Sequence, residues 1–289
     1  MRLSLSIGLG IAAAAAAATS ANAELIYGTT QQGFLISFDS ASPDTINTAL
    51  PVQGLMANEH VVGLDFRASD FTLFGYTNFG RTYTINQDTA QATFVGGVMP
   101  FDGSNFGYEW NPVSNTFRVF SEADHNCELG ADGSSIVDQG ALTYAMGDSR
   151  FGMNPNVTMA AFTNSIAGAT ETVLYGIDTG TNALVRLDDP ASGILSSVGN
   201  LGVDINARGG FDISGVTGVA FLGAMLQGES VSRLYTVDLA TGALTEIGQI
   251  DGGLELRTMT VVQPIPSPGA LAIFGLGCAL AGGRRRATR

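Results

Sequence analysis

Three acidic residues occupy the same place in a recurring pattern of a small residue, a large apolar residue, an acid and a second large apolar residue. The acids are Asp65, Glu109 and Asp212. Two carboxyl groups that face each other across a cleft could hydrolyse a glycosidic bond, one as the acid and the other as the base or nucleophile. The bulky apolar neighbours favour instead a structural role, in which each acid accepts hydrogen bonds from the backbone of an adjacent unit. The sequence therefore ranks the structural role first and leaves hydrolysis open.

Other signatures of catalysis are absent from the sequence. The two histidines, His60 and His125, do not have the spacing of a zinc site, and no G-x-S-x-G motif occurs. The chain contains no lysine, which excludes Schiff-base chemistry and a P-loop lysine. We therefore expect no cofactor and no metal site. Calcium bound by acids at hairpin corners is the remaining alternative, although no EF-hand loop supports it.

Cys127 is the only cysteine between residues 24 and 263, so this part of the chain cannot form an internal disulfide. Its neighbours Asp124 and Glu128 disfavour a reactive thiolate. We expect a buried structural cysteine, in a body stabilised by its hydrophobic core.

The acidic pattern repeats along the chain and indicates the fold. Weaker copies occur at Met159–Phe162 and Thr258–Val261, so that the pattern recurs at intervals of 44 to 52 residues. Downstream of most copies comes a β-rich run ending in Asp or Asn, such as Leu174–Asp178 and Leu234–Asp238, and then a turn. This period suits the four-stranded blade of a β-propeller. We expect five blades, starting near residues 25, 61, 105, 157 and 209, with an irregular third unit between His125 and Met146.

The two ends of the repeat predict how the ring closes. The first unit, which begins at Leu25, lacks the strand that opens the other units, whereas Leu256–Val262 resembles that opening strand and has no blade after it. Pairing the C-terminal strand with the N-terminal blade would remove the open edges of the ring. We therefore predict an all-β propeller closed by strands from both ends, without amphipathic helices.

Charge limits the possible partners. Residues 24–263 contain eight arginines and 26 acids, a net charge of −18. Binding to nucleic acid requires a basic surface that neutralises phosphates. Nucleic acid is therefore excluded as a partner.

The two termini resemble export signals. Residues 1–23 combine a basic start, an apolar stretch and an Ala21-Asn22-Ala23 cleavage site, and predict a signal peptide with Glu24 as the first mature residue. Residues 264–289 combine Pro266-Ser267-Pro268, an apolar run and Arg284-Arg285-Arg286. A helix from 269 to 283 would span roughly 22 Å, shorter than a bilayer core of roughly 30 Å. The propeller domain should then occupy residues 24–263.

This C-terminal arrangement resembles the PEP-CTERM sorting signal, with Ser267 where the family usually has Glu. The resemblance implies that an exosortase-like transpeptidase cuts at the signal, so that the membrane helix is transient and the protein reaches the cell envelope surface or the extracellular matrix. An ordinary membrane anchor that is never cleaved is the alternative.

The body resembles a second family, the bacterial domain of unknown function 4394, over residues 25–255. The run Phe106–Val119 carries most of the likeness, and two further stretches, 161–175 and 202–213, support it. Members usually have Asp at the position of Glu109 and a basic residue near Glu128. The resemblance implies a propeller-like fold and an extracellular setting, and brings no established activity.

Two functions remain open from the sequence. The preferred one is a non-enzymatic surface or matrix protein that binds extracellular polysaccharide, a surface protein or cations. The alternative is a secreted polysaccharide hydrolase or lyase that uses Asp65, Glu109 and Asp212.

Overall fold

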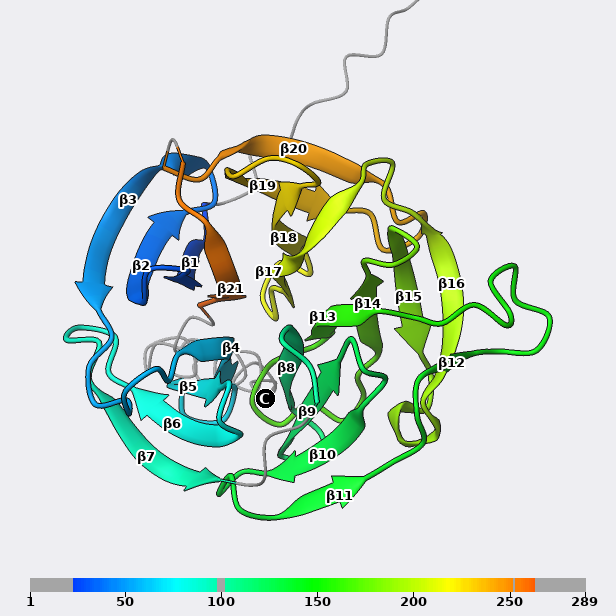
Figure 1. Cartoon of the computed structure of the whole chain (residues 1–289), viewed down its shortest axis with the longest axis horizontal. Helices are drawn as coiled ribbons and strands as arrows, with labels where there is room; N and C mark the ends of the chain where they lie inside the picture. Colours follow the sequence, from blue (N-terminus) through cyan, green and yellow to red (C-terminus); the bar gives the residue numbers. More distant parts are fainter. Residues whose placement is uncertain (1–22, 98–101, 252, 263–289) are drawn as a thin grey trace, which may run out of the picture.

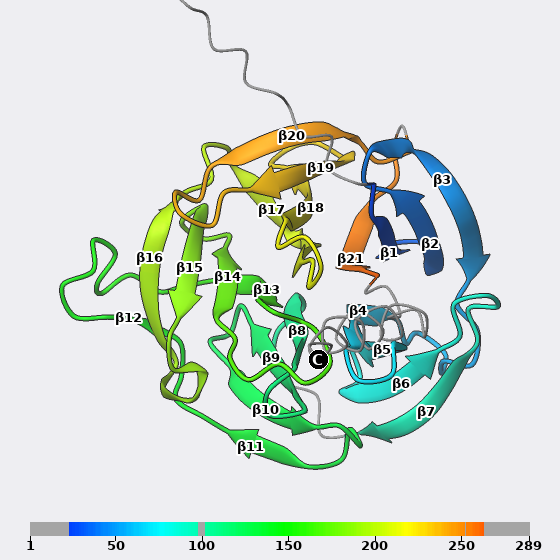
Figure 2. The same ribbon diagram turned by 180° about the vertical axis from the view of Figure 1, so that it is seen from behind.

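The computed structural model describes residues 23–97, 102–251 and 253–262; the predicted signal peptide and sorting signal lie outside these ranges. Five antiparallel sheets surround a central channel, as Figures 1 and 2 show from opposite sides. The predicted five-bladed β-propeller is therefore confirmed. In the described part of the chain, the only helix is a single 3-10 turn at Pro190–Ser192, and no helix is long and apolar enough to span a membrane.

The first blade contains both ends of the described chain. Its order is β21-β1-β2-β3, where β21 is the C-terminal strand. The pairing of β21 with β1 is antiparallel and joins Ile26 to Val261. This confirms the predicted closure. The strands are β1 (Leu25–Thr30), β2 (Phe34–Asp39), β3 (Ser42–Pro51) and β21 (Leu256–Val261).

The second and third blades each follow the chain without interruption. The second contains β4 (Val61–Arg67), β5 (Thr72–Thr77), β6 (Arg81–Ile85) and β7 (Ala92–Gly97). The third contains β8 (Phe106–Asn111), β9 (Thr116–Ser121), β10 (Asn126–Gly130) and β11 (Ile136–Asp138).

The fourth sheet has one strand more than predicted. It contains β13 (Val157–Phe162), β14 (Leu174–Asp178), β15 (Ala183–Leu187) and β16 (Ile194–Asn200), and β12 (Thr143–Tyr144) adds to its outer edge in parallel with β16. The irregular segment of the third unit thus ends in the fourth blade. The physical reason is burial, because Leu142 and Tyr144 pack into the core of the fourth blade.

The fifth blade contains β17 (Ile205–Ile213), β18 (Ala220–Leu226), β19 (Ser232–Val237) and β20 (Leu244–Gln249). Asp or Asn side chains hold several of the turns between outer strands, as their sequence position predicts. Asp178 accepts hydrogen bonds from the backbone N–H groups of Gly180 and Thr181, and Asp238 accepts one from Ala240.

The innermost strands of the five blades line the channel and are β21, β4, β8, β13 and β17 (Figure 1). Each contacts the innermost strand of the next blade. These are the strands that carry the five copies of the acidic pattern.

Candidate functional site

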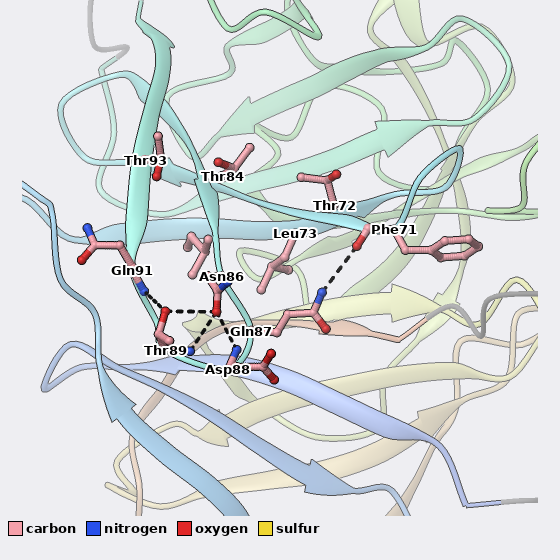
Figure 3. A pocket seen from close by; sticks show the side chains of 11 residues that line it. Phe71, Thr72, Leu73, Thr84, Asn86, Gln87, Asp88, Thr89, Gln91 and Thr93 are labelled. Atoms are coloured by element: carbon pink, nitrogen blue, oxygen red, sulfur yellow. Dashed lines mark hydrogen bonds between the residues drawn. The ribbon is translucent and has the colours of Figure 1, made fainter.

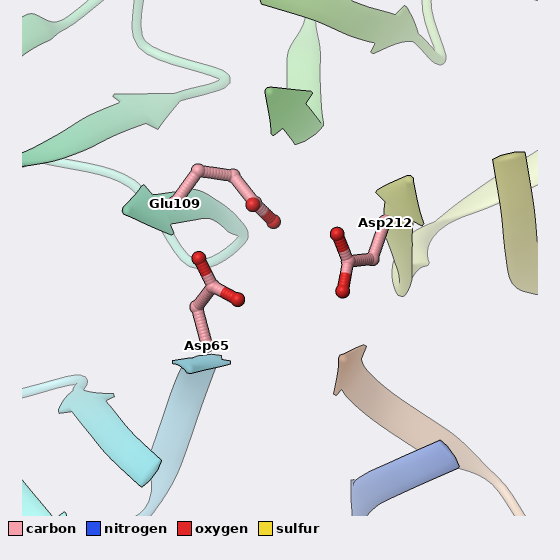
Figure 4. A group of neighbouring side chains, drawn as sticks. All are labelled: Asp65, Glu109 and Asp212. Atoms are coloured by element: carbon pink, nitrogen blue, oxygen red, sulfur yellow. The ribbon is translucent and has the colours of Figure 1, made fainter. Parts of the chain in front are cut away.

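The innermost strands bring the three predicted acids together. Asp65 on β4, Glu109 on β8 and Asp212 on β17 point toward one another at the centre of the ring (Figure 4). One carboxylate oxygen from each lies within 4.8 Å of the others. All three side chains are buried, with at most 4% of each residue exposed. Thr260 on β21 and Ala161 on β13 occupy the same position of the pattern in the other two blades.

Two of the acids accept hydrogen bonds from the backbone of a neighbouring blade. Asp65 accepts from Trp110 N at 2.6 Å and from Phe66 N at 2.7 Å. Asp212 accepts from Val261 N and from Ile213 N, both at 2.6 Å. These two carboxylates therefore join the second blade to the third and the fifth to the first, which is the geometry of the structural role.

The Thr260 hydroxyl lies between the same two acids. Its Oγ1 is 3.0 Å from Asp65 Oδ1 and 3.0 Å from Asp212 Oδ2. A hydroxyl has one hydrogen to donate, so it satisfies one carboxylate fully at any moment. The contact of Thr260 with the other carboxyl group is a hydrogen bond only if that group carries a proton to donate.

Glu109 is held differently from the other two acids. Its side chain lies within hydrogen-bonding reach of the Asp65 carboxyl, a contact that raises the pKa of Glu109. Two carboxyl groups can share such a bond only when one of them is protonated. In the described part of the chain, no arginine or histidine forms an ion pair with any of the three acids.

Burial raises the pKa of each acid, and repulsion within the cluster raises the pKa of Asp65 and Glu109 further. Removal from water raises the pKa of Asp65 to about 8, with a further contribution from the charge of Asp212. Burial raises the pKa of Asp212 to about 6, against the lowering effect of its hydrogen bonds to Val261 and Thr260. Burial, followed by the charges of Asp65 and Asp212, raises the pKa of Glu109 well above its usual value. The cluster therefore retains protons near neutral pH.

A small cavity that is lined by Glu109, and by neither aspartate, cannot hold a polysaccharide. The cavity that Glu109 lines has a volume of about 10 Å³, close to the minimum for one water molecule. A calcium ion requires six to eight oxygen ligands, and the Asp65 and Asp212 oxygens already accept backbone hydrogen bonds. These residues suit a shared proton better than a calcium ion or a sugar ring.

The other chemically interesting residues predicted from the sequence lie apart from this cluster. Cys127 is buried, its Sγ lies 3.0 Å from Asp138 Oδ1, and burial followed by Asp138 raises the pKa of its thiol to about 12. Such a thiol is inert near neutral pH. Burial, and then the charge of Arg257, lowers the pKa of His60, whose ring hydrogen-bonds to the backbone of Asn58.

The structure also shows a groove that the sequence did not single out. It has a volume of about 680 Å³ and lies over one end of the second blade, a size typical of ligand sites. Figure 3 shows the side chains that line it. Most are uncharged hydroxyls and amides, with one carboxylate: Thr72, Thr84, Asn86, Gln87, Asp88, Thr89, Gln91 and Thr93. Phe71, Leu73 and Ile85 complete the lining.

Side-chain hydrogen bonds fix the β6–β7 turn that lines the groove. Asn86 Oδ1 accepts hydrogen bonds from the backbone N–H groups of Asp88 and Thr89. Gln87 Nε2 lies 3.5 Å from the Phe71 carbonyl oxygen. Phe71 has a φ of 58°, which is rare for a bulky residue. Asn86 ends a β-rich run of the kind that recurs along the chain, and nothing in that pattern distinguished its turn from the turns of the other blades.

A family model for a domain of unknown function, DUF4394, matches residues 34–260. The chain belongs to the DUF4394 family. This confirms the resemblance seen in the sequence of the body. No curated protein matches the chain.

Solved structures resemble this DUF4394 protein at low sequence identity. A protein of unknown function from Bacteroides thetaiotaomicron VPI-5482 matches with a TM-score of 0.50 and 10% identity, over 84% of this chain and 68% of that one. A chain of a nidogen/laminin complex matches with a TM-score of 0.48 and 9% identity, over 84% of this chain and 100% of that one. The Dos1 propeller matches with a TM-score of 0.40 and 13% identity, over 77% of this chain and 57% of that one.

Proposed function

We propose that this DUF4394 protein is an exported propeller of the cell surface or extracellular matrix, and that it acts as a non-enzymatic binding module. The observation that carries the proposal is the contrast between its two polar sites. The three carboxyl groups that could have hydrolysed a glycoside are buried, and the cavity that Glu109 lines has a volume of only about 10 Å³. The large groove on the second blade is open and lacks paired carboxylates, with Asp88 as its only acid.

The groove chemistry favours a hydroxyl-rich ligand such as an extracellular polysaccharide. Thr84 on β6 and Thr93 on β7 lie directly opposite each other in the sheet and both line the groove. Their hydroxyls, with the amides of Gln87 and Gln91, can each donate and accept hydrogen bonds. A neutral sugar presents the same mixture of donors and acceptors.

Binding of the purified full chain to polysaccharide from the envelope of the producing bacterium tests this proposal. We expect the wild-type chain to bind, and the double variant Thr84→Val/Thr93→Val to bind at least tenfold more weakly. The matched control is Thr236→Val/Thr245→Val, which changes the opposed threonines on β19 and β20 of the fifth blade. Equal binding by both double variants would remove the groove from the proposal.

The alternative of a polysaccharide hydrolase or lyase has a separate test. New reducing ends or unsaturated sugars formed by the wild-type chain, and lost in Asp212→Asn, would establish catalysis and contradict a purely binding role. We expect no product from either protein, because all three acids are buried and the cavity that Glu109 lines is smaller than a sugar ring.

Export is tested at the N-terminus of the protein from its natural cells. We expect N-terminal sequencing to begin at Glu24, after cleavage behind Ala23. Protein recovered mainly from the cytoplasm with Met1 intact would overturn export.

Processing of the C-terminus has its own measurement. If an exosortase-like enzyme recognises Pro266-Ser267-Pro268, mass spectrometry should find the mature protein without Arg284–Arg286, in the medium, the matrix or joined to a surface carrier. A dominant mature form that still carries those arginines and stays with the membrane would favour an uncleaved anchor.

A further inference from the structure

Two arginines at one mouth of the channel lack the carboxylate partners that most of the other arginines have. The described chain contains eight arginines, and five of them form ion pairs with acids. Among the described residues, Arg150, Arg208 and Arg257 form none, although residues 24–263 carry a net charge of −18. Arg150 instead donates a hydrogen bond to Asn200. Because acids outnumber arginines about threefold here, two adjacent arginines without an ion pair require an explanation.

Neighbouring innermost strands place these two arginines close together. Arg257 is the second residue of β21 and Arg208 lies in the first half of β17, and β17 and β21 contact each other along the channel. Burial lowers the pKa of Arg257, and the charge of Arg208 lowers it further, whereas Glu255 acts in the opposite direction. The same Arg257 charge lowers the pKa of His60, which directly precedes β4. The charges of Arg208 and Arg257 therefore lie close enough to repel each other, with Glu255 as the acid that acts on Arg257.

Polar groups at this mouth also lack hydrogen-bond partners. Arg257 donates to Gln31 through one terminal nitrogen, but its Nε is buried and makes no hydrogen bond. The hydroxyl of Thr158, at the start of β13, is likewise unpartnered, and only 1% of this residue is exposed. Leaving such groups without a hydrogen bond destabilises the folded state, and more so when the group is charged.

Thr158 and Arg257 line the same small cavity. Its volume is about 10 Å³, and its other lining residues are Val62, Ser104, Asn105, Phe106 and the two neighbours of Arg208, Ala207 and Gly209. A space of this size accepts a single oxygen atom. A water molecule could bond to both groups, but it carries no charge to offset the repulsion between Arg208 and Arg257. An oxygen of an anion would satisfy the hydrogen bonds and the charge together.

We propose that this mouth of the channel is an oxyanion-binding site, in which one oxygen of the anion bonds to Thr158 Oγ1 and Arg257 Nε and the charge of Arg208 strengthens binding. The ligand chemistry is a carboxylate, as in a uronic acid, or a phosphate group. The site is distinct from the groove of the second blade and does not depend on the ligand of that groove.

Calorimetric titration of the full chain at low ionic strength tests the proposal with three probes: galacturonate, inorganic phosphate and, as a neutral control, galactose. We expect one of the two anions to bind at a single site, and binding to weaken as sodium chloride is added. Preference for galacturonate identifies a carboxylate site, and preference for phosphate identifies a phosphate site. Galactose should give no binding that depends on Arg257.

Three variants locate the bound anion. Arg257→Gln should weaken anion binding at least tenfold, and Thr158→Val should weaken it several-fold while leaving the fold intact. The matched control Arg186→Gln, which removes an exposed arginine paired with Asp188, should bind the anion as the wild type does. Failure of both anions to bind, or equal affinities for the wild type, Arg257→Gln and Thr158→Val, would overturn the site.

Discussion

At the residue scale, the centre of the ring contains three carboxyl groups that have more hydrogen-bond acceptors than the surrounding groups have donors. Asp65 and Asp212 each accept two backbone hydrogen bonds, and both approach the single Thr260 hydroxyl. Glu109 faces Asp65 rather than a donor of its own. Protons must therefore supply the remaining bonds, and the stability of the fold should follow the protonation of the cluster.

The first prediction is a loss of stability as the pH rises. The folded state raises the pKa of Asp212 to about 6 and that of Asp65 to about 8, above unfolded values of about 3.9. The folded chain therefore binds more protons than the unfolded chain between these values, so its free energy of unfolding falls from about pH 4 until the pH passes about 8. For Asp212 alone the loss is on the order of 3 kcal/mol. Denaturant unfolding at pH 5 and pH 8.5 measures the difference in the free energy of unfolding. Greater stability at pH 8.5 would contradict the prediction.

The second prediction concerns Glu109→Gln. Glutamine keeps the length and shape of the side chain, and its amide can donate to Asp65 without a shared proton. We expect this variant to be more stable than the wild type at pH 8 by about 1–3 kcal/mol, and to lose part of the pH dependence. The matched control is Glu229→Gln, an exposed residue paired with Arg233, which should change little. A lower melting temperature of Glu109→Gln than of the wild type at pH 8 would contradict this prediction. It would show that the cluster needs a third negative charge, which would favour a bound cation.

At the scale of the element, the small first residue of the repeated pattern is explained by close packing of the innermost strands. A Cβ atom on Gly63 would lie 2.3 Å from Tyr108 Cβ in the next blade. A Cβ atom on Gly210 would lie 2.1 Å from the backbone nitrogen of Met259. The acid that follows each glycine can therefore reach the backbone of the neighbouring strand. The small residue and the acid act together to join one blade to the next.

The third prediction tests this explanation with Gly210→Ala. The new methyl group would collide with backbone that cannot rotate away, so β17 and β21 must separate and the Asp212 bond to Val261 should weaken. We expect a loss of about 1–3 kcal/mol in the free energy of unfolding. The control is Gly248→Ala on β20, where the added Cβ would meet only the ring of Pro43 at 3.3 Å. Equal stability of the two variants in thermal unfolding would contradict the packing argument.

At the scale of the whole molecule, the ring is held by a strand from the far end of the chain. β21 pairs with β1, contacts β4 and β17 on either side, and supplies both Thr260 and Val261 to the central acids. The same strand therefore closes the ring and supplies hydrogen-bond donors to the acid cluster.

The fourth prediction is that a chain ending at Gly253 does not form a stable ring. It lacks β21, so the edge of β1 is exposed and Asp212 loses its partners on the first blade. Folded domains are typically stable by about 5–15 kcal/mol, and we expect most of this margin to be lost. Circular dichroism and light scattering should show unfolding or aggregation at temperatures where the full chain is intact. A truncated chain with the same melting temperature as the full chain would contradict closure by β21.

The sequence by itself determined the propeller, its five blades and its closure. Spacing along the chain is enough for this inference, because each blade repeats the same local order of apolar residues, acids and turn residues. The same pattern singled out Asp65, Glu109 and Asp212, since equivalent positions on the innermost strands must meet near the axis. The extra strand at Thr143–Tyr144 was missed because its short sequence carries no periodic signal and its place depends on packing in another blade.

Only the tertiary structure decided what the acids face and where ligands could enter. Alternation along a strand leaves two directions for a side chain, and contacts between blades select one of them. The bond from Val261 to Asp212 joins residues 49 positions apart, and the arginines near the channel mouth come from different blades. Such proximity arises from closure of the ring, so no local pattern encodes it. The groove on the second blade likewise depends on how β5, β6 and β7 lie side by side.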